Sequence, residues 1–141
     1  MNPCFQMDSS AFVADQELIA ALEKSATTVC CCEEDRVLFQ QGDPSDGVYI
    51  LYKGDAVLKM KAADGTTVMC IQTYAGSLLG LPGLIGNEPY SLTATAHKGA
   101  ELRFVSREDF LTAMSEDAAI GFKVLQILAA EVRSARQALM V

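Results

Sequence analysis

Hydrophobic and polar positions follow two different periods along the chain. A spacing of three and four places Leu18, Ile19 and Leu22 on one face of a short helix that opens at Asp15. From Thr27 to Val105 the pattern changes to short β-rich segments separated by turn residues. The predicted strands are residues 27–32, 36–40, 48–52, 56–62, 66–74, 92–97 and 101–105. Repeated short strands at this spacing favour a sandwich or barrel over a parallel α/β sheet.

Turn residues support this division. The pair Asp64-Gly65 stands between two strand patterns, and this pair is a strong hairpin signal because both residues tolerate positive φ. Residues 41–47 and 53–55 read as two further corners. Residues 75–89 contain four glycines and two prolines, so we do not expect a simple strand there.

The helical period returns after the last predicted strand. Ser106, followed three residues later by Asp109, predicts a helix N-cap and a helix through Met114. A longer helix is predicted over about 117–137, and it carries two apolar stripes. The longer stripe comprises Ala118, Gly121, Leu125, Leu128, Val132, Ala135 and Leu139. The shorter stripe comprises Ile120, Val124 and Ile127.

Two apolar faces on one helix need two partners. We therefore expect one face to cover the barrel and the other to form a homodimer, with Leu125, Leu128, Val132, Ala135 and Leu139 at the interface. The alternative is one broad stripe buried within a monomer.

Length and composition predict one folded domain over residues 1–141. Half of the 141 residues are hydrophobic and 21% are charged, and the mean hydropathy is +0.20. These values exclude an intrinsically disordered chain. We expect an arm and helix over 1–26, in which 1–14 have no clear period, a barrel over 27–105 and helices over 106–141.

Charge and targeting signals narrow the class of protein. The net charge of −7 repels polyanions, so we expect no direct DNA binding. No run reaches the roughly 20 apolar residues of a membrane span, and the N-terminus lacks a secretory signal. We expect a cytoplasmic protein in which the five cysteines, an odd number, are reduced thiols.

One run of residues carries a resemblance to a known family. Residues 37–54 read Val-Leu-Phe-Gln-Gln-Gly-Asp-Pro-Ser-Asp-Gly-Val-Tyr-Ile-Leu-Tyr-Lys-Gly. This run resembles the opening of a cyclic-nucleotide-binding domain of the catabolite activator and fumarate-nitrate regulator superfamily. The match continues through Asp64-Gly65, residues 76–95 and residues 103–110 into the long helix, and covers roughly 27–139.

The resemblance implies a mainly β fold. The expected fold is a double-stranded β-helix, or jelly-roll barrel, flanked by a short N-terminal helix and a long C-terminal dimerisation helix. In the family a winged helix-turn-helix domain follows that helix. Because the sequence ends at Val141, we expect this DNA-binding domain to be lacking and any output to pass through a regulator protein partner.

The resemblance also implies a phosphate-binding cassette, in which a glutamate follows a glycine at a short helix and an arginine comes about ten residues later. Aligned on Gly80 and Pro89, this chain has Leu81 in place of the glutamate and Tyr90 in place of the arginine. An anion buried without counter-charge is desolvated at a cost that a phenol hydrogen bond does not offset. We therefore do not expect an ordinary cyclic AMP receptor.

Two interpretations of residues 80–87 stay open. They either hold a weaker or different ligand or only close the barrel. The candidate ligand-binding residues are Gly80, Leu81, Gly83, Leu84, Tyr90, Ser91, Thr93 and Arg136. Arg136 is the candidate counter-ion from the long helix, although an exposed helical arginine is the plainer interpretation.

The cysteines and the histidine give weaker indications of function than the cassette does. On a strand, Cys30 and Cys32 share one face and Cys31 takes the other, so the three cannot bind one ion without a bulge. They are interpreted as buried strand residues, with a redox-responsive thiol as the alternative. His97 is the sole histidine, which excludes a multi-histidine metalloenzyme site, and we read it as a strand end rather than a haem ligand.

These observations predict a non-catalytic regulatory or sensor domain with no metal and no cofactor beyond a small-molecule or nucleotide ligand of unknown identity. The alternatives are a ligand-free interaction module that acts on a partner regulator and a redox or haem sensor.

Overall fold

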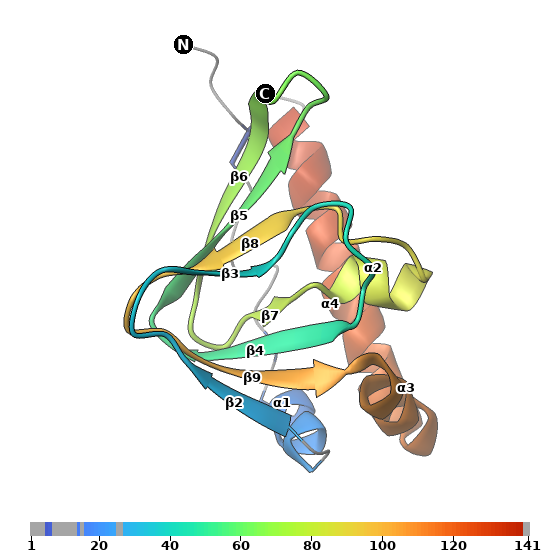
Figure 1. The fold of residues 1–141 in the computed structure, drawn as a ribbon. Helices are drawn as coiled ribbons and strands as arrows, with labels where there is room; N and C mark the ends of the chain where they lie inside the picture. Colours follow the sequence, from blue (N-terminus) through green and yellow to red (C-terminus); the bar gives the residue numbers. More distant parts are fainter. Residues whose placement is uncertain (1–4, 7–13, 15, 25–26, 140–141) are drawn as a thin grey trace.

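Two β-sheets face each other and form the barrel (Figure 1). The computed structural model describes residues 5–6, 14, 16–24 and 27–139, except for the side chains of residues 5, 6, 27, 138 and 139. One sheet has the order β1 (Phe5–Gln6), β6 (Thr67–Tyr74), β5 (Asp55–Lys61), β8 (Thr93–Ala96) and β3 (Arg36–Phe39). The other has the order β2 (Thr27–Cys31), β9 (Glu101–Ser106), β4 (Gly47–Lys53) and β7 (Leu78–Leu79).

The jelly-roll fold predicted from the sequence is confirmed. Each of the seven predicted strands is present with its ends within one residue of the prediction. Two short strands were not predicted. The strand β7 has only two residues, and β1 pairs in parallel with β6 at Phe5 and Gln6. Phe5 and Gln6 belong to the arm whose residues 1–14 show no clear period, and they form a strand because an edge distant in sequence supplies the pairing. Residues 1–4 and 7–13 lie outside the described part.

The hairpin between β5 and β6 turns at the predicted Asp64-Gly65 pair. Gly65 has a φ of +88°, and the Thr66 N–H donates to the Asp64 carboxylate at 2.8 Å. The turn thus satisfies its own polar groups, as such turns commonly do.

Four helices flank the sheets in the described residues: α1 (Gln16–Glu23), α2 (Leu81–Gly86), α3 (Arg107–Glu116) and α4 (Ala118–Leu139). The predicted cap of α3 is confirmed, because the Ser106 hydroxyl accepts a hydrogen bond from the Asp109 N–H at 3.2 Å. The long helix α4 runs along one side of the barrel, from α3 towards the end of the sheet that contains β5 and β6 (Figure 1).

The core has two parts. One lies between the sheets and includes Leu58, Ile71 and Leu102. The other lies between the four-stranded sheet and the helices, and its helical members include Leu18 and Leu22 of α1 and Phe110 of α3. The shorter apolar stripe of α4 belongs to this second part: Ile120, Val124 and Ile127 are all buried. The prediction that one face of the long helix covers the barrel is thereby confirmed.

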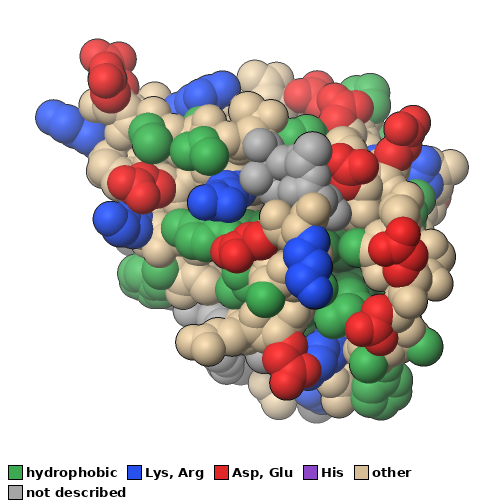
Figure 2. Space-filling model, turned by 90° about the horizontal axis from the view of Figure 1, so that it is seen from below, with side chains coloured by type: hydrophobic (Ala, Val, Ile, Leu, Met, Phe, Trp, Pro, Cys, Tyr) green, Lys and Arg blue, Asp and Glu red, His purple; other side chains and the backbone are tan. Residues whose placement is uncertain are grey.

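Charged side chains are dispersed on one face of the molecule (Figure 2). On the face seen in Figure 2, lysine and arginine side chains alternate with acidic ones and do not gather into one patch. Across the described residues, none of the helices is both long enough and apolar enough to cross a membrane.

Candidate ligand site

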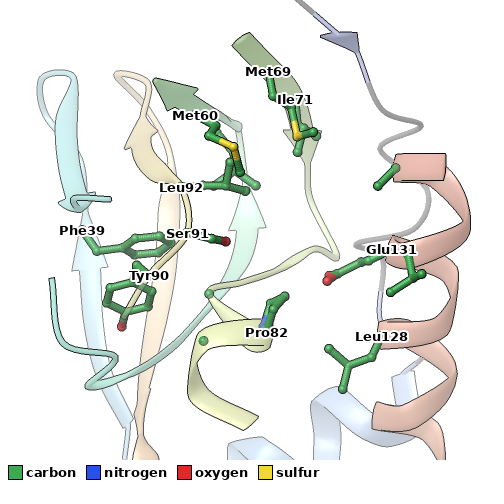
Figure 3. A pocket seen from close by; sticks show the side chains of 15 residues that line it. Phe39, Met60, Met69, Ile71, Pro82, Tyr90, Ser91, Leu92, Leu128 and Glu131 are labelled. Atoms are coloured by element: carbon green, nitrogen blue, oxygen red, sulfur yellow. The ribbon is translucent and has the colours of Figure 1, made fainter. Parts of the chain in front are cut away.

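A cavity of about 260 Å³ lies between the barrel, α2 and α4 (Figure 3). This volume is slightly below the roughly 300–1,000 Å³ that is usual for ligand pockets, so it suits one small molecule. The lining residues are Phe39, Leu58, Met60, Met69, Ile71, Gly80, Pro82, Gly83, Tyr90, Ser91, Leu92, Leu128, Glu131, Val132 and Ala135. Most of them are apolar, which is typical of a small-molecule pocket with few orienting polar groups.

Stacked aromatic rings form one end of the cavity. The ring centroids of Phe39 and Tyr90 lie 3.9 Å apart with an angle of 17° between the planes (Figure 3). The Tyr90 hydroxyl donates to the Gly47 carbonyl at 2.7 Å and accepts from the Gly47 N–H at 3.2 Å. Because the hydroxyl is held by the barrel, Tyr90 offers the cavity an aromatic surface.

Two glycines bring α2 close to the barrel. Gly80 precedes α2 with a φ of +96°, and a Cβ there would lie 2.9 Å from the Tyr90 ring. A Cβ on Gly83 would lie 2.5 Å from the Ser45 hydroxyl oxygen. A side chain at either position would collide with its neighbours, so these glycines set how closely α2 approaches the aromatic end.

Glu131 of α4 lies on the opposite wall from the aromatic pair. Its side chain is only 6% exposed and points from α4 into the cavity (Figure 3). One of its carboxyl oxygens, Oε1, is fully buried and accepts no hydrogen bond from any described group. A buried polar atom without a partner is costly in a folded protein, and each one calls for an explanation.

Burial alone perturbs this carboxyl. Desolvation raises the pKa of Glu131 from 4.5 to about 8, so the carboxyl keeps its proton at neutral pH. Tyr90 is the other titratable side chain on the cavity wall, and burial raises its pKa as well. No lysine or arginine is among the described residues that line the cavity. The site is therefore apolar with one protonated acid.

Comparison with known families identifies the fold. The family model described as the cyclic nucleotide-binding domain matches residues 29–117, which is more than half of the 141-residue chain. The chain belongs to the cyclic nucleotide-binding domain family. This family membership, expected from residues 37–54 and the motifs that follow, is confirmed.

Solved structures of bacterial regulators share the fold. The Catabolite Activator Protein of Thermus thermophilus is 23% identical with a TM-score of 0.74, over 89% of this chain and 58% of that chain. FixK2 of Bradyrhizobium japonicum is 21% identical with a TM-score of 0.69, over 79% of this chain and 55% of that chain. The sensor domain of the transcriptional regulator DNR of Pseudomonas aeruginosa is 16% identical with a TM-score of 0.68, over 87% of this chain and 82% of that chain.

The chain thus spans little more than half the length of the Catabolite Activator Protein and of FixK2, and most of the isolated sensor domain. No curated protein matches it by sequence.

The candidate ligand residues of this cyclic nucleotide-binding domain divide into two groups. Gly80, Gly83, Tyr90 and Ser91 line the cavity. The other four lie elsewhere. Leu81 and Leu84 are buried in the core beneath the helices, the Thr93 hydroxyl accepts a hydrogen bond from the Gln41 N–H at 2.9 Å, and Arg136 is exposed.

The two cassette positions, Leu81 and Tyr90, carry side chains that pack and bear no charge. Leu81 stands where the family has its glutamate, and its side chain is fully buried in the hydrophobic core. Tyr90 stands where the family has its arginine and packs as an aromatic wall. Neither position presents a charge to the cavity.

The predicted dimer stripe of α4 also borders the cavity. Leu128, Val132 and Ala135 line it, and Val132 is nevertheless 52% exposed. Leu125 is 57% exposed and lies outside the lining. Leu139 ends α4, and its side chain lies outside the described part.

The structure also shows where the cysteines and the histidine lie. Cys30 and Cys32 are buried and Cys31 is exposed, as strand alternation predicts, while Cys4 lies outside the described residues. His97 directly follows β8 and its Nδ1 lies 2.6 Å from an Asp55 carboxylate oxygen. Among the residues the structure describes, no group of three or more cysteine, histidine or acidic side chains could hold a metal ion.

Sequence reasoning missed Glu131. A signal was present, because Glu131 falls between Leu128 and Ala135 of the longer apolar stripe of α4. An acidic residue on an apolar helix face is unusual unless it is paired or functional.

Proposed function

We propose that the chain is a non-catalytic sensor domain that binds a small molecule in the cavity between barrel and α4, and that this molecule is not an ordinary cyclic nucleotide. One observation carries the proposal: the cavity holds a buried, unpartnered carboxyl, Glu131, and among its described lining residues no positive side chain that a cyclic phosphate would need.

The electrostatics argue against a cyclic phosphate. A phosphate in a low-dielectric pocket needs charge-assisted hydrogen bonds, which are roughly twice as strong as neutral ones. Leu81 and Tyr90 supply none, and Pro82 in the first turn of α2 has no N–H to donate. An ionised Glu131 would repel the phosphate, and a protonated one would offer a single neutral hydrogen bond.

The helix α4 links the cavity to a surface. Leu128 and Val132 line the cavity, while Leu125 and Phe122 stand exposed on the same helix. Exposed apolar residues at this spacing fit a helix-to-helix interface, so we propose a homodimer through α4. A ligand that binds one position of α4 better than another would then shift the dimer equilibrium.

The regulatory output is proposed from the family. Two similar structures are domains of transcriptional regulators: the N-terminal domain of one from Streptomyces coelicolor and the sensor domain of DNR from Pseudomonas aeruginosa. With a net charge of −7 and no gathered basic patch on the face in Figure 2, this chain is not expected to contact DNA itself. We propose that it acts through a regulator protein partner.

The exposed stripe also supports a second candidate function. Phe122, Leu125 and Val132 are each more than half exposed, which fits a ligand-free module that pairs with a partner regulator. In that case the cavity would bind no ligand, and the protein would act only by pairing with the partner regulator through α4.

A thermal-shift screen with a cavity-filling variant separates the two functions. The panel includes cyclic AMP and small apolar amines, alcohols and carboxylates. Leu92→Trp fills the cavity from the barrel side and leaves the sequence of α4 unchanged, and Leu111→Trp on the exposed side of α3 is the matched control. We expect at least one compound to raise the Tm of the wild type and of Leu111→Trp but not of Leu92→Trp. If no compound raises the Tm of any of the three proteins, the sensor function is rejected in favour of the ligand-free module.

A further inference from the structure

The cavity has two chemically different ends. At one end Phe39 and Tyr90 stack, and Met60 beside Leu92 lines the apolar wall (Figure 3). At the other, Glu131 projects its carboxyl from α4 towards the space between (Figure 3). A single small molecule that fills the cavity would meet apolar and aromatic surface along its body and a carboxyl at its tip.

We infer that the site takes a small lipophilic amine, whose hydrocarbon or aromatic body lies against Phe39 and Tyr90 and whose ammonium group pairs with the Glu131 carboxylate. This inference rests on the proposed ligand-binding function and names the class of ligand. An ammonium group supplies hydrogen-bond donors and the opposite charge to the carboxyl of Glu131, which lines the cavity and has an oxygen without a partner.

No lysine or arginine among the described residues competes for Glu131 from the cavity walls. The lysines of β5, Lys59 and Lys61, flank Met60 and line a different hollow on the outer side of the sheet. Arg133 and Arg136 of α4 itself are exposed and do not line the cavity. Among the described residues that line the cavity, none supplies a positive partner for this carboxyl, which leaves it open to a cationic ligand.

Among the titratable groups near the site, Glu131 is the one whose protonation we expect to change when an amine binds. The Tyr90 hydroxyl is engaged with Gly47. Cys70 lies between Met69 and Ile71 on β6, so strand alternation directs it to the opposite face of the sheet. Lys123, two turns before Glu131 on α4, lies 3.6 Å from a Glu17 carboxylate oxygen.

Amine binding is coupled to proton release. The free acid is protonated below about pH 8, and the bound carboxylate pairs with the ammonium, so Glu131 gives one proton to solvent for each amine bound. Affinity should therefore rise about tenfold per pH unit between pH 6 and 8 and level off above that range.

Calorimetric titration with matched probes tests the inference. We choose 2-phenylethylamine as the cation, 2-phenylethanol as the neutral analogue of similar size and 3-phenylpropanoate as the anion. The wild type should bind the amine at least tenfold more tightly than the alcohol at pH 8 and should not bind the anion measurably. Titrations at pH 7 in two buffers of different ionisation enthalpy should show release of about one proton per amine.

Two variants locate the effect. Glu131→Gln keeps the shape but loses the charge, so its affinity for the amine should fall to that for the alcohol. Glu116→Gln removes an equal charge from the exposed end of α3 and should bind like the wild type. Equal affinity of the wild type for amine and alcohol, or unchanged amine binding by Glu131→Gln, would overturn the amine class and leave ligand binding itself intact. Absence of all binding here, together with a silent thermal-shift screen, would overturn both proposals.

Discussion

Glu131 couples the stability of the fold to pH. In the unfolded chain its carboxyl ionises near pH 4.5, whereas in the fold burial holds the proton until about pH 8. Across this window the unfolded state binds fewer protons than the native state, so the free energy of unfolding falls as pH rises. The stabilisation is fully present below pH 4.5 and is lost by about pH 8.

Glu131→Gln should remove this pH dependence. We expect the variant to gain stability relative to the wild type as pH rises from 4.5 to 8, by on the order of a few kcal/mol, because its amide does not ionise. Thermal unfolding followed by circular dichroism at several pH values measures the difference. Glu116→Gln, at an exposed position, should track the wild type at every pH. If the stability of the two variants changed with pH in the same way, the raised pKa of Glu131 would be contradicted.

Gly80 is needed both for its backbone angle and for the space beside it. Gly80→Ala must hold a φ of +96° and place a Cβ 2.9 Å from the Tyr90 ring, whereas Gly65→Ala at a φ of +88° meets no atom within 4 Å. We expect Gly65→Ala to cost about 1 kcal/mol from the backbone alone and Gly80→Ala about 2–4 kcal/mol. Urea unfolding of both variants measures the gap, and equal losses would show that packing against Tyr90 contributes nothing.

At the scale of elements, α4 has three distinct surfaces. Ile120, Val124 and Ile127 seal the core beneath the helices, while Leu128 and Glu131 face the cavity. Phe122 and Leu125 face outwards and are more than half exposed. A helix that both walls a cavity and offers an apolar surface can transmit binding to assembly, because a shift of α4 changes both faces together.

Leu125→Glu should dissociate the proposed homodimer. A carboxylate on each copy would enter the apolar interface without a partner, and its desolvation opposes association. We expect the variant to be monomeric at micromolar concentration by light scattering while the wild type is dimeric. Leu111→Glu, the same change on the exposed side of α3, is the control and should remain dimeric. A monomeric wild type would reject the dimer directly.

At the scale of the whole molecule, charge decides which partners are excluded. The chain carries 18 acidic and 11 basic residues, and each phosphate contact would need a positive side chain, which the face in Figure 2 does not gather into a patch. We expect no binding to a 20-base-pair DNA duplex at 150 mM salt by fluorescence anisotropy with micromolar protein. Saturable binding that weakens steeply with added salt would show a basic surface that charge counting misses.

Local patterns predicted most of the architecture because each signal acts over a few residues. Alternation placed the seven longer strands, Asp64-Gly65 placed a hairpin, and Ser106 with Asp109 began a helix. The strands β1 and β7 escaped prediction because two residues carry no period, and their pairing depends on β6 and β4. The glycine- and proline-rich segment was recognised as irregular, but its short helix α2 was expected only through the family resemblance.

The candidate site could be predicted only in part. Gly80, Gly83, Tyr90 and Ser91 follow one another closely in sequence and do line one cavity. Thr93 lies apart from it because strand alternation turns neighbouring residues to opposite faces. Arg136 lies outside the cavity because a helix of 3.6 residues per turn directs it to solvent while Glu131 faces inwards.

The sequence by itself determined a sandwich or barrel of short strands and the two stripes of the long helix, since these are read from residue type and spacing. Its resemblance to the family added the jelly-roll fold and the missing charges at Leu81 and Tyr90. Only the tertiary structure decided the character of the site. It turned the Tyr90 hydroxyl towards Gly47 and buried Glu131 against strands that lie more than 50 residues away in sequence. Burial and the lack of a partner depend on what surrounds a side chain in space, so they arise only when distant segments pack together.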